Sequence, residues 1–316
     1  MPELFLPIVA LLVGFYGLMR SADLLVDNAT ELSLRLGVST LMVGIIVIGF
    51  GTSAPEMFVS AVAALENKGN LALGNALGSN ITNIGLVLGC AALISRIPVA
   101  KSTAIADLPV LVVTALLAAY FLLDGTLSGT DGGILLVILI SYLYWSATNA
   151  SSEESNLDIE RHEERSTSSL VSLLIFSIIV LLIASRILVY GATSIAEFFG
   201  ISDLIIGLTV VAIGTSLPEL AAAIAAARRN VHDMILGNII GSNVFNILAV
   251  LGITGMVRST EVDLHVLWRD FPVMLALTLA MIAFAFFGKG FSKLAGVVFV
   301  TSYVAYVTHL VFVALH

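Results

Sequence analysis

Two glutamates stand alone in long apolar segments, and both belong to the same motif, Gly-Thr-Ser-x-Pro-Glu. The motif occupies residues 51–56 and returns at residues 214–219. Glu56 is the only ionisable residue from 36 to 65, and Glu219 is the only one from 204 to 227. At about 1.5 Å per helical residue, each carboxylate lies roughly 14 Å from the end of its segment, near the middle of a ~30 Å hydrocarbon layer. Neither segment offers a basic partner for a buried ion pair, so an isolated carboxylate at this depth indicates a functional site.

Hydroxyl and carbonyl oxygens accompany each glutamate. Thr52 and Ser53 precede Glu56 by four and three residues, so all three share one helical face, and Thr215 and Ser216 repeat this spacing before Glu219. The prolines at 55 and 218 cannot donate to the carbonyl four residues earlier, which predicts a helix break just before each glutamate. An all-oxygen set suits hard cations such as Ca²⁺ or Na⁺. No Cys or His lies nearby, which disfavours zinc and copper.

A second pair of repeated polar residues lies in neighbouring apolar segments. Ser79 and Asn83, and likewise Ser242 and Asn246, are four residues apart near the middle of uncharged stretches. These side chains could either supply neutral oxygens to the glutamates or join helices by hydrogen bonds. For Asn83 and Asn246 we favour the ligand role, whereas for Asn80 and Asn243 both roles remain open. The glycines of the same stretches indicate close helix packing: Gly74, Gly78, Gly237 and Gly241.

The composition is that of an integral membrane protein. Of 316 residues, 59% are hydrophobic and only 11% are charged, against about 25% charged in soluble proteins. The net charge of −8 favours no nucleic-acid partner. The pattern predicts an all-α integral membrane protein with ten spans, at residues 4–33, 38–65, 71–95, 104–123, 131–149, 170–199, 202–227, 234–257, 271–287 and 292–315.

The chain is an internal duplication. An offset of 163 residues superposes the two glutamate motifs, Asn67 on Asn230, and the block Gly-Asn-x-x-Gly-Ser-Asn-x-x-Asn at 74–83 on the block at 237–246. We expect a five-helix repeat at 1–150, an acidic linker at 151–169 and a second repeat at 170–316. Because five spans is an odd number, the second repeat must enter the membrane inverted, as in many secondary transporters.

Basic residues predict the orientation. With both termini outside, the inner loops hold nine Lys and Arg and the outer loops three, which follows the positive-inside rule. The inner set is Arg35, Arg96, Lys101, Arg161, Arg165, Arg228, Arg229, Lys289 and Lys293, and the outer set is Lys68, Arg258 and Arg269.

Other ionisable residues have structural interpretations. Asp107 and Asp270 each stand just before a segment with an early proline, a pattern typical of helix N-caps. All five histidines lie in predicted loops or near the chain end, so neither a histidine proton relay nor a catalytic nucleophile–base pair is favoured. We therefore expect no enzyme activity, no cofactor and no protein partner. The lipid bilayer is the expected surrounding of the chain.

The duplicated Gly-Thr-Ser-x-Pro-Glu and Gly-Ser-Asn-x-x-Asn blocks resemble the repeats of the cation/Ca²⁺ antiporter superfamily, in particular its prokaryotic sodium/calcium exchangers. The resemblance implies a protein of the cytoplasmic membrane that exchanges Na⁺ for Ca²⁺ by alternating access. It implies that Glu56 and Glu219 serve both ions and that Thr52 and Thr215 add oxygens for Ca²⁺. The Na⁺ ligands implied are Ser53, Ser79, Ser216 and Ser242, with backbone oxygens of Gly49 and Ala212.

One position departs from the resemblance, and other functions stay open. Some members of the superfamily carry an aspartate where this chain has Asn246, so only two carboxylates are expected at this site. Ca²⁺/H⁺ exchange through the same two glutamates is the main alternative. A passive channel is less compatible with the inverted repeat.

Overall fold

The computed structural model describes residues 2–148, 166–201, 206, 209–210, 212–263, 266–288 and 290–315. Most of the predicted linker, 151–165, therefore lies outside the described residues. The helix that follows the predicted linker begins at Thr167. Ser166 caps this helix by accepting a hydrogen bond from the backbone N–H of Ser169 at 3.2 Å.

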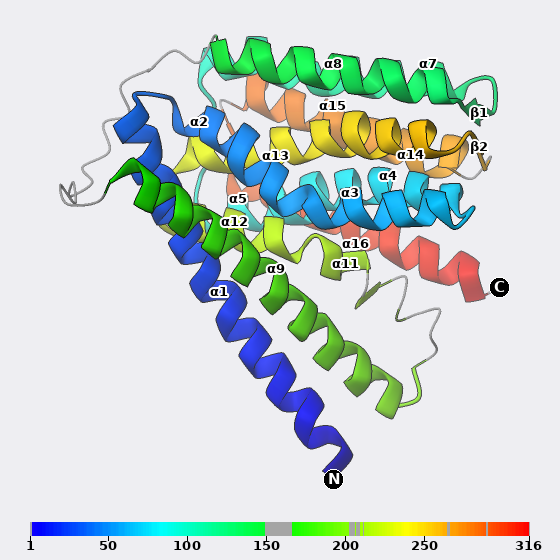
Figure 1. Ribbon diagram of the computed structural model, residues 1–316, viewed down its shortest axis with the longest axis horizontal. Coiled ribbons are helices and arrows are strands. Elements are labelled where there is room, and N and C mark those ends of the chain that lie inside the picture. Colours follow the sequence, from blue (N-terminus) through cyan, green and yellow to red (C-terminus); the bar gives the residue numbers. More distant parts are fainter. Residues whose placement is uncertain are drawn as a thin grey trace.

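The first repeat contains helices in five consecutive spans, and Figure 1 shows how they are arranged. Several spans join α-helices through wider π-helical segments, labelled η. The bounds are α1 Pro2–Leu36; α2 Thr40–Val43, η1 Gly44–Gly49 and α3 Phe50–Leu65; α4 Gly69–Thr82, η2 Asn83–Leu88 and α5 Gly89–Ile94; α6 Lys101–Ala106 and α7 Leu108–Leu122; and, after strand β1 Thr126–Leu127, α8 Gly129–Thr148.

The helices of the second repeat follow the same order, but its strand comes after the third span and not after the fourth. Its elements are α9 Thr167–Phe198; α11 Ala212–Thr215 and α12 Leu217–Arg228; α13 His232–Val244, η4 Phe245–Val250 and α14 Leu251–Val257; strand β2 Thr260–Glu261; η5 Val266–Asp270 and α15 Phe271–Phe287; and α16 Lys293–Leu315. In the described part of the chain, nine helical stretches are long and apolar enough to cross a membrane. Of the remaining predicted span, 202–227, much of the first half lies outside the described residues.

The N-cap interpretation of the two aspartates is wrong. Neither Asp107 nor Asp270 makes a side-chain capping bond, because both adopt helical backbone angles and the helix continues before them. Asp270 instead accepts hydrogen bonds from Arg269 at 2.7 Å and from the Tyr306 hydroxyl at 3.0 Å. The fourth span of each repeat consequently begins before its aspartate, at Lys101 in the first repeat and at Val266 in the second.

Backbone details confirm the duplication. Gly37 and Gly200 have φ of 66° and 73°, and Asn67 and Asn230 have φ of 64° and 57°. Such left-handed angles end helices and favour Gly and Asn. The repeats also exchange matching backbone pairs: β1 pairs antiparallel with β2, and Ile97 bridges Phe291. Each pairing joins the connection after the third span of one repeat to that between the fourth and fifth spans of the other.

Helices α1 and α9 form a pair that extends away from the remaining helices (Figure 1). Their crossing needs glycine. An added Cβ at Gly14 would lie 2.5 Å from the backbone nitrogen of Leu188, and one at Gly191 would lie 2.6 Å from that of Leu11. The first span of each repeat therefore packs mainly on its counterpart.

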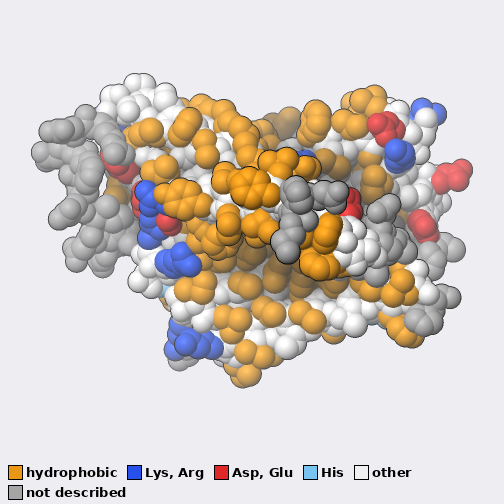
Figure 2. Space-filling model, turned by 90° about the horizontal axis from the view of Figure 1, so that it is seen from below, with side chains coloured by type: hydrophobic (Ala, Val, Ile, Leu, Met, Phe, Trp, Pro, Cys, Tyr) orange, Lys and Arg blue, Asp and Glu red, His pale blue; other side chains and the backbone are white. Residues whose placement is uncertain are grey.

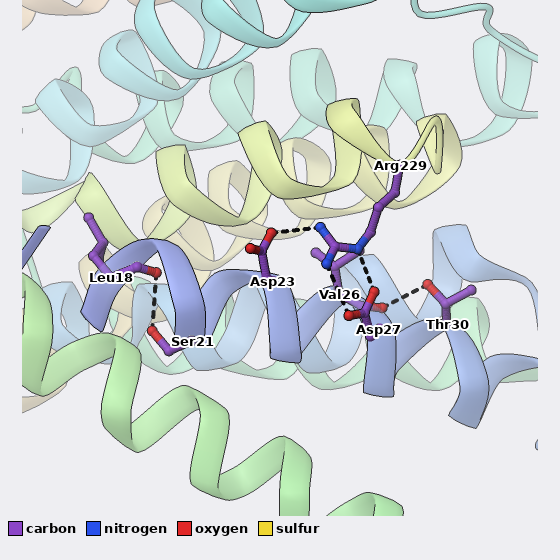
Figure 3. A network of polar contacts seen from close by, with 7 residues as sticks. All are labelled: Leu18, Ser21, Asp23, Val26, Asp27, Thr30 and Arg229. Atoms are coloured by element: carbon purple, nitrogen blue, oxygen red, sulfur yellow. Dashed lines mark hydrogen bonds and ion pairs between the residues drawn. The ribbon is translucent and has the colours of Figure 1, made fainter. Parts of the chain in front are cut away.

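An ion-pair network ties α1 to the end of α12 (Figure 3). The Arg229 guanidinium donates to Asp23 at 2.6 Å and makes two bonds to Asp27 from a neighbouring turn of α1. Partial burial lowers the pKa of Arg229, but hydrogen bonds to Asp27 and Asp23 outweigh it and raise this pKa above its ordinary value. The guanidinium, held by two carboxylates, thus remains charged and fixes α1 against the second repeat.

The surface is that of a protein in lipid. Hydrophobic side chains cover the middle of the face seen in Figure 2, while Lys, Arg, Asp and Glu gather toward its two ends. Large apolar side chains such as Phe5, Tyr120 and Phe176 are more than half exposed. Water would make such exposure costly, whereas a bilayer stabilises it.

Candidate ion-binding site

The two glutamates are buried inside the protein, and a hydrogen bond between the repeats reaches one of them. Glu56 on α3 and Glu219 on α12 are each only 1% exposed. The Ser53 hydroxyl of the first repeat donates to the Glu219 carboxylate of the second at 3.2 Å. The first repeat thus contributes to the surroundings of the second repeat's carboxylate, as expected for a site between inverted repeats.

The predicted helix break occurs in one repeat only. In the second repeat Ser216 forms a turn between α11 and α12, so Pro218 falls in the first turn of α12, where its missing N–H costs little. In the first repeat the prediction is wrong, because α3 runs without interruption from Phe50 through Pro55. The irregular geometry lies one turn earlier, in the π-helical segment η1, which ends at Gly49.

The hydroxyl residues of the two motifs have different surroundings. Thr52 is fully buried and its hydroxyl lies 3.0 Å from the Ile48 carbonyl and 3.5 Å from the Ser242 hydroxyl. Ser216 is 1% exposed, and its hydroxyl has no hydrogen-bond partner among the described residues. Thr215 ends α11 and is half-buried. Ala212 begins α11, so its backbone stands one turn before this pair.

Asn83 and Asn246 lie where their spans widen into π-helix. Asn83 is the first residue of η2 and Asn246 the second of η4, and they are 1% and 0% exposed. The side-chain oxygens of both lack a hydrogen-bond partner within the described part of the chain. Ser79 and Ser242, one turn earlier on the same faces, are also buried. All four side chains are therefore buried in the interior, and their role as neutral oxygen ligands stays a prediction.

The open question at Asn80 and Asn243 is answered in part. The Asn80 amide donates to the backbone carbonyl of Asn243 at 3.3 Å, and the Asn243 amide donates to the Ile239 carbonyl at 2.7 Å. The first bond joins the two repeats, whereas the second lies within α13. The side-chain oxygens of both asparagines have no hydrogen-bond partner among the described residues.

Two asparagines that sequence reasoning left without a role touch the glutamates' own backbone. The Asn75 amide lies 3.4 Å from the Glu56 carbonyl, and the Asn238 amide lies 3.2 Å from the Glu219 carbonyl. The available signal was their exact recurrence, since each follows a glycine in the duplicated block at 74–83 and 237–246. Recurrence alone could not distinguish them from packing residues.

Unpaired buried oxygens define the chemistry of the centre. Among the described residues, one carboxylate oxygen of Glu56 and one of Glu219 receive no hydrogen bond. The side-chain oxygens of Asn83 and Asn246 receive none either. Burying such groups without partners is costly, and cations compensate that cost. The described residues contain no cluster of three or more His, Cys, Asp or Glu, so the charge here comes from two carboxylates with neutral oxygens around them. This donor set suits Ca²⁺ and Na⁺.

Two inverted five-helix repeats that enclose a buried, oxygen-rich centre define the class as a membrane secondary transporter. The chain belongs to the sodium/calcium exchanger protein family, whose model matches residues 6–148 and 169–312. It is an all-α integral membrane protein of ten transmembrane helices, and this family is one of transporters.

Similar proteins cover nearly the whole chain. The inner membrane protein YrbG of Escherichia coli is 40% identical over 277 residues, which is 85% of either chain. The sodium/calcium exchanger MaX1 of Methanosarcina acetivorans is 29% identical over 96% of this chain and 98% of its own. A solved structure of the sodium-calcium exchanger NCX_Mj, soaked with Na⁺ and Sr²⁺, matches with a TM-score of 0.85 and 33% identity, over 96% of this chain and 98% of that one.

Proposed function

We propose that the protein is a secondary active antiporter that exchanges Na⁺ for Ca²⁺ by alternating access at the centre between its repeats. The observation that carries this proposal is the group of buried oxygens without hydrogen-bond partners on Glu56, Glu219, Asn83 and Asn246. Two carboxylates balance the charge of one Ca²⁺ or of two Na⁺. A shared site that holds either load, but not both, couples the two fluxes.

We assign the oxygens the roles that the resemblance to the antiporter superfamily implies. Glu56 and Glu219 serve both ions, and Thr52 and Thr215 add oxygens for Ca²⁺. Further Na⁺ must bind through neutral groups, because no charge remains for it. These groups are Asn83, Asn246, Ser53, Ser216, Ser79 and Ser242, with the backbone oxygens of Gly49 and Ala212.

The test is uptake of radioactive Ca²⁺ into proteoliposomes under imposed gradients. An outward Na⁺ gradient is expected to drive Ca²⁺ accumulation, and dissipating it with a sodium ionophore is expected to stop it. Accumulation driven by a pH gradient without Na⁺ would instead support Ca²⁺/H⁺ exchange through the same glutamates. Ca²⁺ entry that never exceeds equilibrium and ignores both gradients would indicate a channel.

Orientation supplies one prediction. The nine-to-three distribution of basic residues places both termini outside a prokaryotic cytoplasmic membrane. In a protein whose Cys90 is replaced by alanine, Lys68→Cys is expected to react with an impermeant maleimide in intact cells, and Ser155→Cys only after permeabilisation. Lys68 is suited to labelling because it is exposed in the turn before α4. Labelling of Ser155→Cys alone in intact cells would invert the proposed topology.

Potassium supplies a second prediction. K⁺ is larger than Na⁺, and a further carboxylate would offset the cost of its dehydration. Asn246 is neutral where potassium-dependent relatives typically carry aspartate. We therefore expect Na⁺-driven Ca²⁺ uptake at clamped voltage to change by less than about twofold when choline replaces K⁺.

The matched variant is Asn246→Asp, which adds a third carboxylate at the same place. Its ion preference is expected to shift relative to the unmodified protein under identical voltage clamp. Strong K⁺ stimulation of the unmodified protein would show that neutral ligands are sufficient for K⁺ and would overturn the prediction.

A further inference from the structure

We propose that Asn238 is a positioning residue for the ion site, one that holds the Glu219 backbone and the hydroxyls of Thr52 and Ser242 in a single arrangement across the two repeats. This inference rests on the proposed exchange site. It assigns no new ligand. It concerns which side chain gives the hydroxyl oxygens a geometry in which they can bind a cation.

Asn238 lies on α13 and is only 1% exposed. It precedes Ser242 by four residues and Asn246 by eight, so the three share one face of the span. Its amide nitrogen donates to the Glu219 carbonyl at 3.2 Å. Because that carbonyl can only accept, the contact fixes the amide with its nitrogen toward Glu219 and its oxygen on the opposite side.

The Asn238 side-chain oxygen faces two hydroxyls of the proposed site. Thr52 of the first repeat donates to it at 3.4 Å, and Ser242 of the second at 3.5 Å. A hydroxyl that directs its proton to a protein acceptor keeps its lone pairs available for a cation. The Asn238 oxygen therefore orients hydroxyls from both repeats as potential ion ligands. The single Thr52 proton is shared between the Asn238 oxygen and the Ile48 carbonyl, which lies nearer at 3.0 Å.

The repeat-related asparagine has different partners. The Asn75 amide is shared between the Glu56 carbonyl at 3.4 Å and the Ser60 hydroxyl at 3.0 Å, both on α3 of its own repeat. At the position that corresponds to Ser60, the second repeat has Ala223, which cannot hydrogen-bond through its side chain. Asn75 is also only half-buried. The duplication has thus given equivalent asparagines different tasks, a local one at 75 and a connection between repeats at 238.

The experiment compares Asn238→Ala with its matched control Asn75→Ala, in proteoliposomes and by equilibrium binding of Ca²⁺ to the purified protein. Asn238→Ala is expected to raise both the KM of exchange and the Kd for Ca²⁺ about tenfold, since it removes three hydrogen bonds at the site. The change in kcat is expected to be smaller. Asn75→Ala is expected to raise the same constants by no more than about threefold.

The design separates this proposal from packing and from the proposed function. Thermal unfolding in detergent reports whether each variant folds, and Asn238→Ser, which keeps a smaller polar group, replaces the alanine variant if that one does not. Equal effects of the alanine variants at 238 and 75 would overturn the proposal. So would an unchanged Kd for Ca²⁺ in a folded variant at 238. If the unmodified protein binds Ca²⁺ but performs no exchange, the proposed function fails while the binding comparison still decides the role of Asn238.

Discussion

Replacing Glu219 or Glu56 with glutamine is expected to abolish Na⁺-driven Ca²⁺ uptake while the protein remains inserted and folded. Each is one of two carboxylates buried at the centre, and each is only 1% exposed. At about 4 Å and an effective dielectric constant of 20, one unit charge contributes roughly 4 kcal/mol to binding of a monovalent cation. That corresponds to about a thousandfold in affinity, and the effect is larger for Ca²⁺.

The measurement is Ca²⁺ uptake together with Ca²⁺ binding to the purified variants. The matched control is Glu66→Gln, which neutralises a glutamate that is about half exposed and pairs with Lys68 in the turn after α3. That variant is expected to transport within about twofold of the unmodified protein, because an exposed ion pair contributes little. Near-normal uptake by a folded Glu56→Gln or Glu219→Gln protein would remove that residue from the mechanism.

Replacing Gly241 with alanine is expected to separate the two central spans and to stop exchange. The glycine lies where α13 crosses η1, and an added Cβ would press on the Ile45 carbonyl and lie 2.8 Å from the Ile45 Cα. These atoms are backbone and cannot turn away as a flexible side chain can. Overpacking typically costs about 1–3 kcal/mol, and a backbone contact should lie at the upper end. Because Ser242 is the next residue, the shift also moves part of the proposed ion site.

Thermal unfolding in detergent and Na⁺-driven Ca²⁺ uptake measure the two consequences. Gly133→Ala is the control, since it makes the same change within transmembrane helix α8, where the nearest atom to the new Cβ is the flexible Met256 sulfur at 3.4 Å. That variant is expected to unfold and transport like the unmodified protein. Unchanged stability and uptake in Gly241→Ala would mean that the two spans can repack around a methyl group.

Hydrogen bonds between the two repeats surround the proposed ion site. Ser53 donates to Glu219, Thr52 donates to Asn238, and Asn80 donates to the Asn243 carbonyl. All three bonds join residues of different repeats. Relative movement of the repeats would therefore change the proposed ion site, which is the coupling that the proposed alternating access requires.

The sequence by itself determined the membrane class, the duplication and the two central carboxylates. These features are encoded in local patterns: long uncharged runs, a constant offset of 163 residues, and a lone glutamate in each copy of one motif. These predictions are stronger for a membrane protein than for a soluble one. A charged side chain in an apolar span is costly, so its presence indicates a functional role. Nearly all predicted spans begin and end within a few residues of the helical stretches in the structure.

Only the tertiary structure decided how the two copies differ. Equal motifs gave a continuous helix at Pro55 and a broken one before Pro218, and equal asparagines gave a local bond at 75 and a connection between repeats at 238. The decisive partners lie in the other repeat or on a neighbouring helix, and no periodic pattern specifies such distant contacts. Helix packing selects them, because a buried polar group bonds to whichever partner the fold places within reach.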